Sequence, residues 1–91
     1  MQRSYKPAAP VAYPLEDARD RLRRLLPDLD RWTPLAGVAP LGTPTAGPSR
    51  ASYVASTLAA SLELVKEGAM DARQLEAFAD IYLRARKGEA A

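Results

Sequence analysis

Two residue types that many enzymes use for acid–base and nucleophilic chemistry, histidine and cysteine, are missing from this chain. It contains no cysteine and no histidine among its 91 residues, which excludes Cys–His and Ser–His–Asp catalysis within the chain together with disulfides and thiolate zinc sites. Serine, lysine, tyrosine and carboxylates are present, but no pair of them has a recognisable catalytic arrangement. Asp28 and Asp30 are interpreted as turn residues, because no further ligands follow at the spacing of a metal-binding loop. We therefore expect no enzyme activity, metal, cofactor or small-molecule substrate.

Length and charge narrow the remaining function classes. A chain of 91 residues forms one small domain, and much of its apolar content is alanine, so its stability is expected to depend in part on a partner. The net charge is only +2, and the excess lies in the amino-terminal arm, whereas nucleic-acid surfaces concentrate basic residues on one face. No apolar run reaches the roughly 18–20 residues of a membrane span, and residues 1–12 do not resemble a signal peptide. We expect a cytoplasmic protein that binds no membrane.

The first strong helical pattern covers residues 13–29. Apolar residues recur there at steps of three and four, the spacing of one face of an amphipathic helix. Pro14 suits a first helical turn, and Pro27 disfavours helical geometry at the residue before it. We predict a helix at about residues 14–26, after a flexible linker arm at residues 1–12. The expected core positions are Leu15, Ala18, Leu22, Leu25, Leu26 and Leu29.

A short helix and a long helix follow. Thr33 as cap and Pro34 at the first position predict a short helix at about residues 34–39, and residues 40–48, rich in glycine and proline, predict a flexible loop. Ser49 as cap and Gly68 as stop predict a long helix at about residues 49–67. The expected core positions are Leu35, Val38 and Leu41, then Ala51, Val54, Ala55, Leu58, Leu62 and Val65, widened by Ala59 and Leu64. Trp32 is interpreted as a core residue first and as a binding anchor second.

The segment at residues 69–86 allows two interpretations. No glycine or proline interrupts it, and Asp71 with Gln74 would form a capping box, so composition alone favours a helix. However, Ile81-Tyr82-Leu83-Arg84 alternates like a half-buried strand, and Met70-Asp71-Ala72-Arg73 does the same. Two such strands would form a hairpin. Residues 87–91 are expected to be a disordered tail.

The stretch ASYVASTLAASLELVKEGAMDARQLEAFADIYLRAR, residues 51–86, resembles the carboxy-terminal domain of segregation and condensation protein A (ScpA), the bacterial kleisin family. The resemblance depends on an alanine-rich helix ending in LELVKEG, a strand through Arg73-Gln74, a turn at Phe78 and a strand through IYLR. Upstream, YPLEDARDRLRRLL is similar to the first helix of the same domain, so about residues 5–86 are covered. Ala79 departs from the family, in which we expect a glycine in the wing turn.

This resemblance implies a fold and a function. The fold is mainly α with a small β-hairpin (α+β): a winged helix at residues 13–86, with three helices and a two-stranded wing at about residues 69–75 and 80–85. The function is to bind the ATPase head of a structural-maintenance-of-chromosomes (SMC) protein in chromosome condensation and segregation, as a nucleoid-associated, non-enzymatic subunit. A complete kleisin also has an amino-terminal domain and a middle region, and its middle region recruits segregation and condensation protein B (ScpB). Both parts are missing here, so we expect a carboxy-terminal fragment that contacts DNA only through the complex.

Five residues are candidates for contact with the partner. In a hairpin, Ile81 and Leu83 would face the core, while Tyr82 and Arg84 would face outward, where both residue types are enriched at interfaces. Phe78 at the turn either folds back on the core or anchors in the partner. Arg19 and Arg23 on the first helix are solvated or steer association with an acidic head surface. The candidate partner-binding residues are Phe78, Tyr82, Arg84, Arg19 and Arg23.

The alternative is a small winged-helix DNA-binding protein that uses its basic arm and wing. Helices that read DNA carry polar and basic side chains toward the bases and phosphates. The long helix has no charge between Ser52 and Leu62, and Glu63 and Glu67 would repel phosphate. An uncharged helix of small residues favours packing against protein.

Overall fold

The computed structural model describes residues 12–42 and 46–86. Apart from Ala12, the arm expected at residues 1–12 lies outside the described residues. The tail expected at residues 87–91 and residues 43–45 of the expected loop lie outside them as well.

Three α-helices form at the places that the sequence predicts. Helix α1 spans Leu15–Leu25 and continues into a short 3-10 turn, η1, at Leu26–Asp28. Helix α2 is the short helix Leu35–Val38, and α3 is the long helix Arg50–Lys66. Ser49 caps α3 as predicted, because its Oγ accepts a hydrogen bond of 3.1 Å from the Ser52 N–H. Gly68 follows the end of α3 with a φ of +84°, the left-handed conformation that glycine adopts without cost.

The cap predicted for the short helix is wrong. Pro34, not Thr33, holds the N-cap position of α2, and no side chain caps this helix. Thr33 lies in an extended strand instead, and its hydroxyl donates to the Arg31 carbonyl at 2.9 Å. The physical reason is that Pro34 is itself extended, with a ψ of 138°, and that Thr33 pairs with Leu83, so the helix starts one residue later than predicted.

The last part of the described chain is a hairpin, and the helical interpretation of residues 69–86 is wrong. Strand β2 (Met70–Gln74) pairs antiparallel with β3 (Ile81–Ala85). A third strand, β1 (Thr33–Pro34), pairs with the other edge of β3, in the order β1-β3-β2. The sheet is therefore three-stranded and not the two-stranded ribbon that was expected. It leaves the outer edge of β2 unpaired within the described residues.

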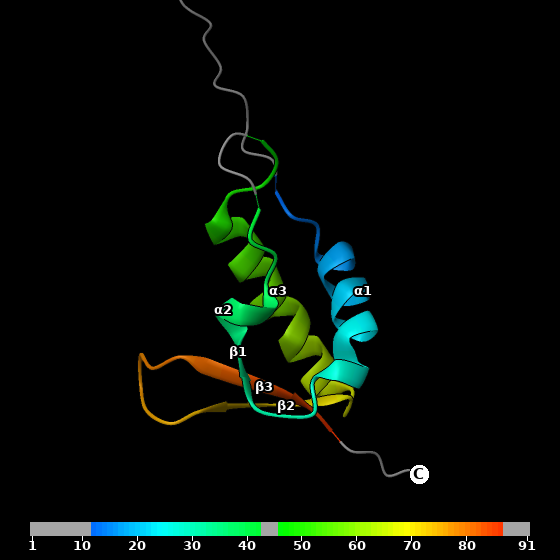
Figure 1. The fold of residues 1–91 in the computed structure, drawn as a ribbon, viewed down its shortest axis with the longest axis vertical. Coiled ribbons are helices and arrows are strands. Elements are labelled where there is room, and N and C mark those ends of the chain that lie inside the picture. Colours follow the sequence, from blue (N-terminus) through cyan, green and yellow to red (C-terminus); the bar gives the residue numbers. More distant parts are fainter. Residues whose placement is uncertain (1–11, 43–45, 87–91) are drawn as a thin grey trace, which may run out of the picture.

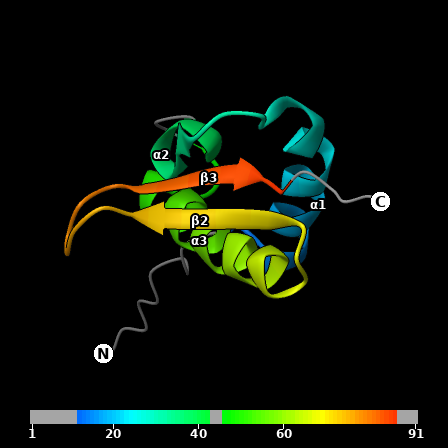
Figure 2. The same cartoon turned by 90° about the horizontal axis from the view of Figure 1, so that it is seen from below.

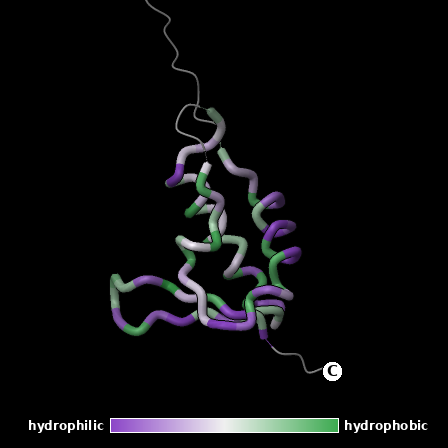
Figure 3. The backbone as a smooth tube through the Cα atoms, in the orientation of Figure 1, coloured by the Kyte–Doolittle hydropathy of each residue, from purple (hydrophilic) through white to green (hydrophobic). Residues whose placement is uncertain are grey.

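The sheet closes one end of a helical layer. Helices α1 and α3 lie side by side, and the strands run across their ends (Figures 1 and 2). The hydrophilic turns of α1 face away from α3, and its hydrophobic segments face toward it (Figure 3). Alternate sheet residues complete this core, because Met70 and Leu83 are fully buried and Ile81 packs against the same cluster. The buried hydrophobic residues are Ala18, Leu22, Leu29, Leu35, Val38, Ala39, Ala60, Leu64, Met70 and Leu83.

The predicted core face of the long helix is only partly right. Val54, Leu58 and Val65 pack against the core, but the fully buried residues of α3 include Thr57 and Ser61. A search for apolar residues does not find these two buried positions. The Ser61 hydroxyl donates a hydrogen bond of 2.8 Å to the Leu58 carbonyl, so it has a partner within the helix. Six positions that were expected in the core are exposed: Leu15, Leu41, Ala51, Ala55, Ala59 and Leu62.

Candidate protein-binding surface

One face of α3 is exposed and carries no charge. Ala51, Ala55, Ala59 and Leu62 follow one another at steps of four, four and three, so they form one stripe along the helix. All four are exposed, and Leu62 keeps 49% of its surface in solvent. We call these four residues the α3 face. Its small side chains allow another protein backbone to approach closely.

The α3 face leads into a hollow beneath the hairpin. Leu62, Ala72, Arg73, Gln74 and Ile81 line this hollow, whose volume is about 210 Å³. It exists because the helices cover only one end of the hairpin, where Met70 and Leu83 are buried. The other end extends beyond the helices (Figure 2), so the apolar underside of the strands stays open there.

Phe78 stands at the tip of the hairpin and is fully exposed. Of the two alternatives for this residue, folding back on the core is therefore wrong. The chain turns at Phe78 with a φ of +65°, a conformation that is unfavourable for a bulky side chain. The family resemblance led us to expect a glycine at the position of Ala79. The left-handed residue of the turn is instead Phe78, so the position of Ala79 does not require a glycine. Leu75, 73% exposed, makes the tip more apolar still.

The outer face of the sheet holds the other two candidates of the hairpin. Tyr82 and Arg84 lie on the face opposite to buried Leu83, as expected. Trp32 is not a core residue: it is half-buried, and the guanidinium groups of Arg73 and Arg84 lie 5.0 and 4.3 Å from the centroid of its ring. The alternation of the strand predicts the position of Arg84, but Trp32 reaches this face through the short strand β1, which the sequence did not indicate.

Arg19 and Arg23 are engaged within the domain. Arg19 pairs with Glu63 at 3.3 Å and with Glu67 at 3.2 Å, and Arg23 pairs with Glu67. These ion pairs join α1 to the last turns of α3. The two arginines are about a third to a half exposed, so a partner that used them would compete with the glutamates.

The basic side chain at the start of α3 also has hydrogen-bond partners within the domain. Arg50 donates hydrogen bonds to the carbonyls of Ala36, Ala39 and Pro40, at 2.6, 3.3 and 2.7 Å. It thereby satisfies carbonyls at the end of α2 and holds the connection between α2 and α3. Among the described residues, α3 keeps only Lys66 as a basic side chain without such a partner.

The described residues contain neither a metal-binding cluster nor a membrane-spanning helix. In residues 12–42 and 46–86, no three acidic, histidine or cysteine side chains gather so that they could hold a metal ion. Within the same ranges, no helix combines the length and the apolarity needed to cross a membrane. Comparisons of the chain with protein-family models, with curated proteins and with solved structures find no match.

Proposed function

We propose that this chain is a winged-helix domain that binds the ATPase head of an SMC protein, as the carboxy-terminal domain of a bacterial kleisin. The sequence resemblance supports this assignment, and so does the order of elements, in which three helices precede an antiparallel hairpin. In this proposal β2 and β3 form the wing, and β1 adds a short third strand to it. The domain is non-enzymatic, because the SMC head carries the ATPase chemistry. ScpB would be recruited by other parts of a complete kleisin, and DNA would be held by the assembled complex.

The observation that carries the proposal is the exposed apolar surface formed by the α3 face, the hollow and the hairpin tip. Leu62 joins the α3 face to the hollow, and exposed apolar surface of this kind is typical of a protein interface. A fully exposed phenylalanine is suited to anchor in a partner's pocket. Phe78 makes no core contact that would explain its presence at the tip. We place Phe78 and Leu62 at the centre of the contact with the head.

DNA binding, the alternative, has less support from the side chains. Helix α3 would have to enter the major groove, but Arg50 already donates to three carbonyls. Glu63 and Glu67 lie near the other end of the same helix and would meet phosphates. Between these ends α3 carries no Arg, Lys, Asn or Gln, the side chains that make most base contacts. The hydroxyls of Ser52 and Ser56 already bond to the Tyr13 backbone.

The test is a calorimetric titration of the full chain with the purified head domain of the SMC protein from the same organism. We expect a one-to-one complex, weakened about tenfold or more by Phe78→Asn and by Leu62→Glu. Asparagine suits the left-handed conformation at position 78, so this variant should remain folded. Leu41→Ser is the matched control, because Leu41 is 80% exposed but lies in the loop after α2, outside the proposed surface.

Two results would overturn the proposal. One is an absence of binding at tens of micromolar of both proteins. The other is tight binding of the chain alone to duplex DNA that weakens steeply with salt, as released counterions require. The second result would instead favour the DNA-binding alternative.

A further inference from the structure

The outer face of the sheet gathers aromatic and cationic side chains from three separate segments. Trp32 precedes β1, Arg73 lies on β2, and Tyr82 and Arg84 lie on β3. Arg73 stands directly opposite Tyr82 in the register. Both guanidinium groups contact the ring of Trp32 at distances typical of cation–π interactions. We call these four residues the Trp32 cluster.

The two arginines of the cluster lack hydrogen-bond acceptors in the described part of the chain. Stacking on a ring uses the flat face of a guanidinium group and leaves its N–H donors available. Arg86, by contrast, donates to Asp71 at 2.8 Å. Asp71 stands opposite Arg84 in the register, but its Oδ1 accepts both hydrogen bonds from Arg86. The Trp32 cluster therefore presents two positioned cations, and the complementary group is a carboxylate or a phosphate.

An apolar hollow lies beside these cations. Trp32, Arg73, Leu75 and Tyr82 line it, and its volume is about 180 Å³. Two aromatic residues and a leucine make most of this lining apolar. Such a hollow suits one large apolar side chain, held next to an anion that the arginines bind.

We infer that the Trp32 cluster binds an acidic peptide segment of another protein. In this interaction, an Asp or Glu carboxylate of the segment accepts hydrogen bonds from Arg73 or Arg84, and a neighbouring large apolar side chain enters the hollow. The cluster lies on the face of the sheet opposite to the α3 face. This second binding surface shares Arg73 and Leu75 with the border of the surface proposed for the SMC head, whereas Trp32, Tyr82 and Arg84 belong to it alone.

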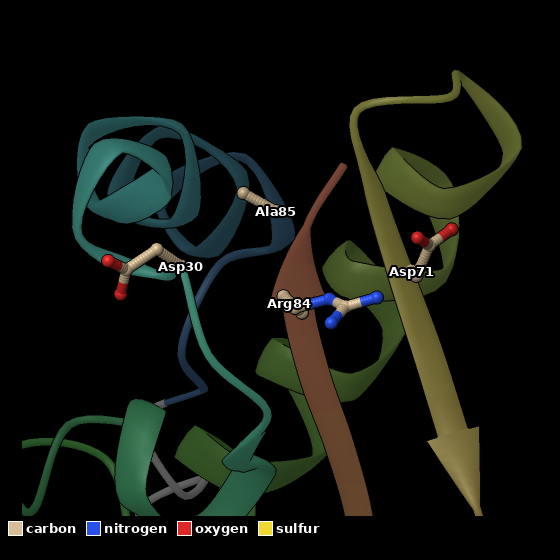
Figure 4. A pocket seen from close by; sticks show the side chains of 4 residues that line it. All are labelled: Asp30, Asp71, Arg84 and Ala85. Carbon is tan, nitrogen blue, oxygen red and sulfur yellow. The ribbon is translucent and has the colours of Figure 1, made fainter. Parts of the chain in front are cut away.

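The charges around the cluster favour an acidic peptide over a nucleic acid. Asp30 and Asp71 line an adjacent hollow of about 200 Å³ together with Arg84 and Ala85 (Figure 4). The hairpin tip adds Glu76 and Asp80. A run of phosphates crossing this face would meet several of these carboxylates, whereas a peptide can present one carboxylate to the arginines and keep its neighbouring residues uncharged.

Trp32 is the only tryptophan of the chain, so its fluorescence reports on this surface alone. The experiment selects random peptides displayed on phage against the immobilised full chain. Synthetic copies of the selected peptides are then titrated while Trp32 fluorescence is recorded. We expect enrichment of Asp or Glu next to Leu, Phe or another large apolar residue, and a saturable fluorescence change.

Three comparisons make the test specific. Arg73→Gln and Arg84→Gln should each weaken peptide binding about tenfold or more, as expected for the loss of a charge-assisted hydrogen bond. Arg24→Gln, which removes an exposed arginine of α1, should leave binding unchanged. Replacing the acidic residues of the peptide by their amides should abolish the fluorescence change.

The inference is overturned by a selected pool without acidic enrichment, or by peptides that bind the Arg73→Gln/Arg84→Gln double variant as tightly as the original chain. It is also overturned if a thymidine oligonucleotide at about 150 mM salt binds more tightly than every selected peptide, since that result assigns the cluster to single-stranded nucleic acid.

Discussion

Gly68 and Phe78 both adopt left-handed backbone conformations where the chain turns. This conformation suits glycine but is unfavourable for phenylalanine. Gly68 ends α3 with a φ of +84°, and Phe78 turns the hairpin with a φ of +65°. A left-handed residue other than glycine costs roughly 1–2 kcal/mol. The glycine therefore sits where the fold needs it, whereas Phe78 occupies a strained position without any compensating core contact. This contrast is the reason that we treat Phe78 as a binding residue and Gly68 as a structural one.

Substitution of Gly68 tests this distinction. Gly68→Ala should destabilise the domain by about 1 kcal/mol, measured as the free energy of unfolding in urea. A Cβ at this position would lie 3.8 Å from the nearest Arg86 nitrogen, so the cost arises from the backbone and not from a clash. Gly37→Ala is the control: it lies within α2 with open space around it, and we expect it to be neutral or slightly stabilising. Equal effects of the two substitutions would contradict the argument.

At the scale of elements, local patterns identified the helices but not all of their contacts. Caps and prolines placed α1, α2 and α3 within one or two residues of their bounds, and alternation revealed the hairpin. Strand β1 was missed because two residues carry no periodicity, and its pairing with β3 joins residues that are far apart in the sequence. The buried side of α3 was misplaced because alanine fits either face of a helix and because the buried hydroxyls of Thr57 and Ser61 look polar in the sequence.

The candidate binding residues could also be predicted from the sequence only in part. The outward positions of Tyr82 and Arg84 follow from the alternation of a strand, whereas the sequence left open whether Phe78 folds back on the core or stays exposed. The Trp32 cluster does not, since it needs the third strand. The engagement of Arg19 and Arg23 with Glu63 and Glu67 also escaped prediction, because it depends on how α1 and α3 lie against each other.

The junction between the start of α1 and α3 gives a prediction about pH. The Tyr13 N–H donates to the Ser52 hydroxyl at 2.9 Å, and its ring packs against Tyr53 with 4.7 Å between centroids. Burial raises the pKa of the Tyr13 phenol above 10.0, its ordinary value. As the pH rises past 10, the phenol of Tyr13 therefore loses its proton in the unfolded chain before it does so in the folded chain. The contribution of Tyr13 to stability is complete below pH 10 and is lost as the pH rises through the pKa of the folded state.

Tyr13→Phe should remove this part of the pH dependence. The free energy of unfolding of the variant should fall less steeply above pH 10 than that of the original chain. Absorbance of phenolate near 295 nm, recorded in parallel, should show one late-titrating tyrosine fewer in the folded variant. Identical slopes for the two proteins would show that Tyr13 ionises equally in both states.

At the scale of the whole molecule, the sheet completes the only large hydrophobic core of the described residues. The inner side of β3 places Leu83 against Leu22 of α1 and Leu64 of α3 in one cluster, and all three are fully buried. A domain of this size has a total stability of roughly 5–15 kcal/mol, and helices with so much alanine have little other apolar surface to bury. Folding of the hairpin and of the helices should therefore be one cooperative event.

Leu83→Ala tests this cooperativity from the side of the sheet. Truncation of a fully buried leucine costs about 2–5 kcal/mol, a large part of the total stability. Because the same cluster holds the helices together, circular dichroism should show helical signal and hairpin structure disappearing in a single transition at lower urea, with most molecules of the variant close to unfolding at 37 °C. Leu41→Ala removes a leucine that is 80% exposed and should change stability by less than about 0.5 kcal/mol. If Leu83→Ala instead unfolds the hairpin while the helices keep their original midpoint, the hairpin is an appendage, and a binding surface that spans α3 and the hairpin would lose its rigid support.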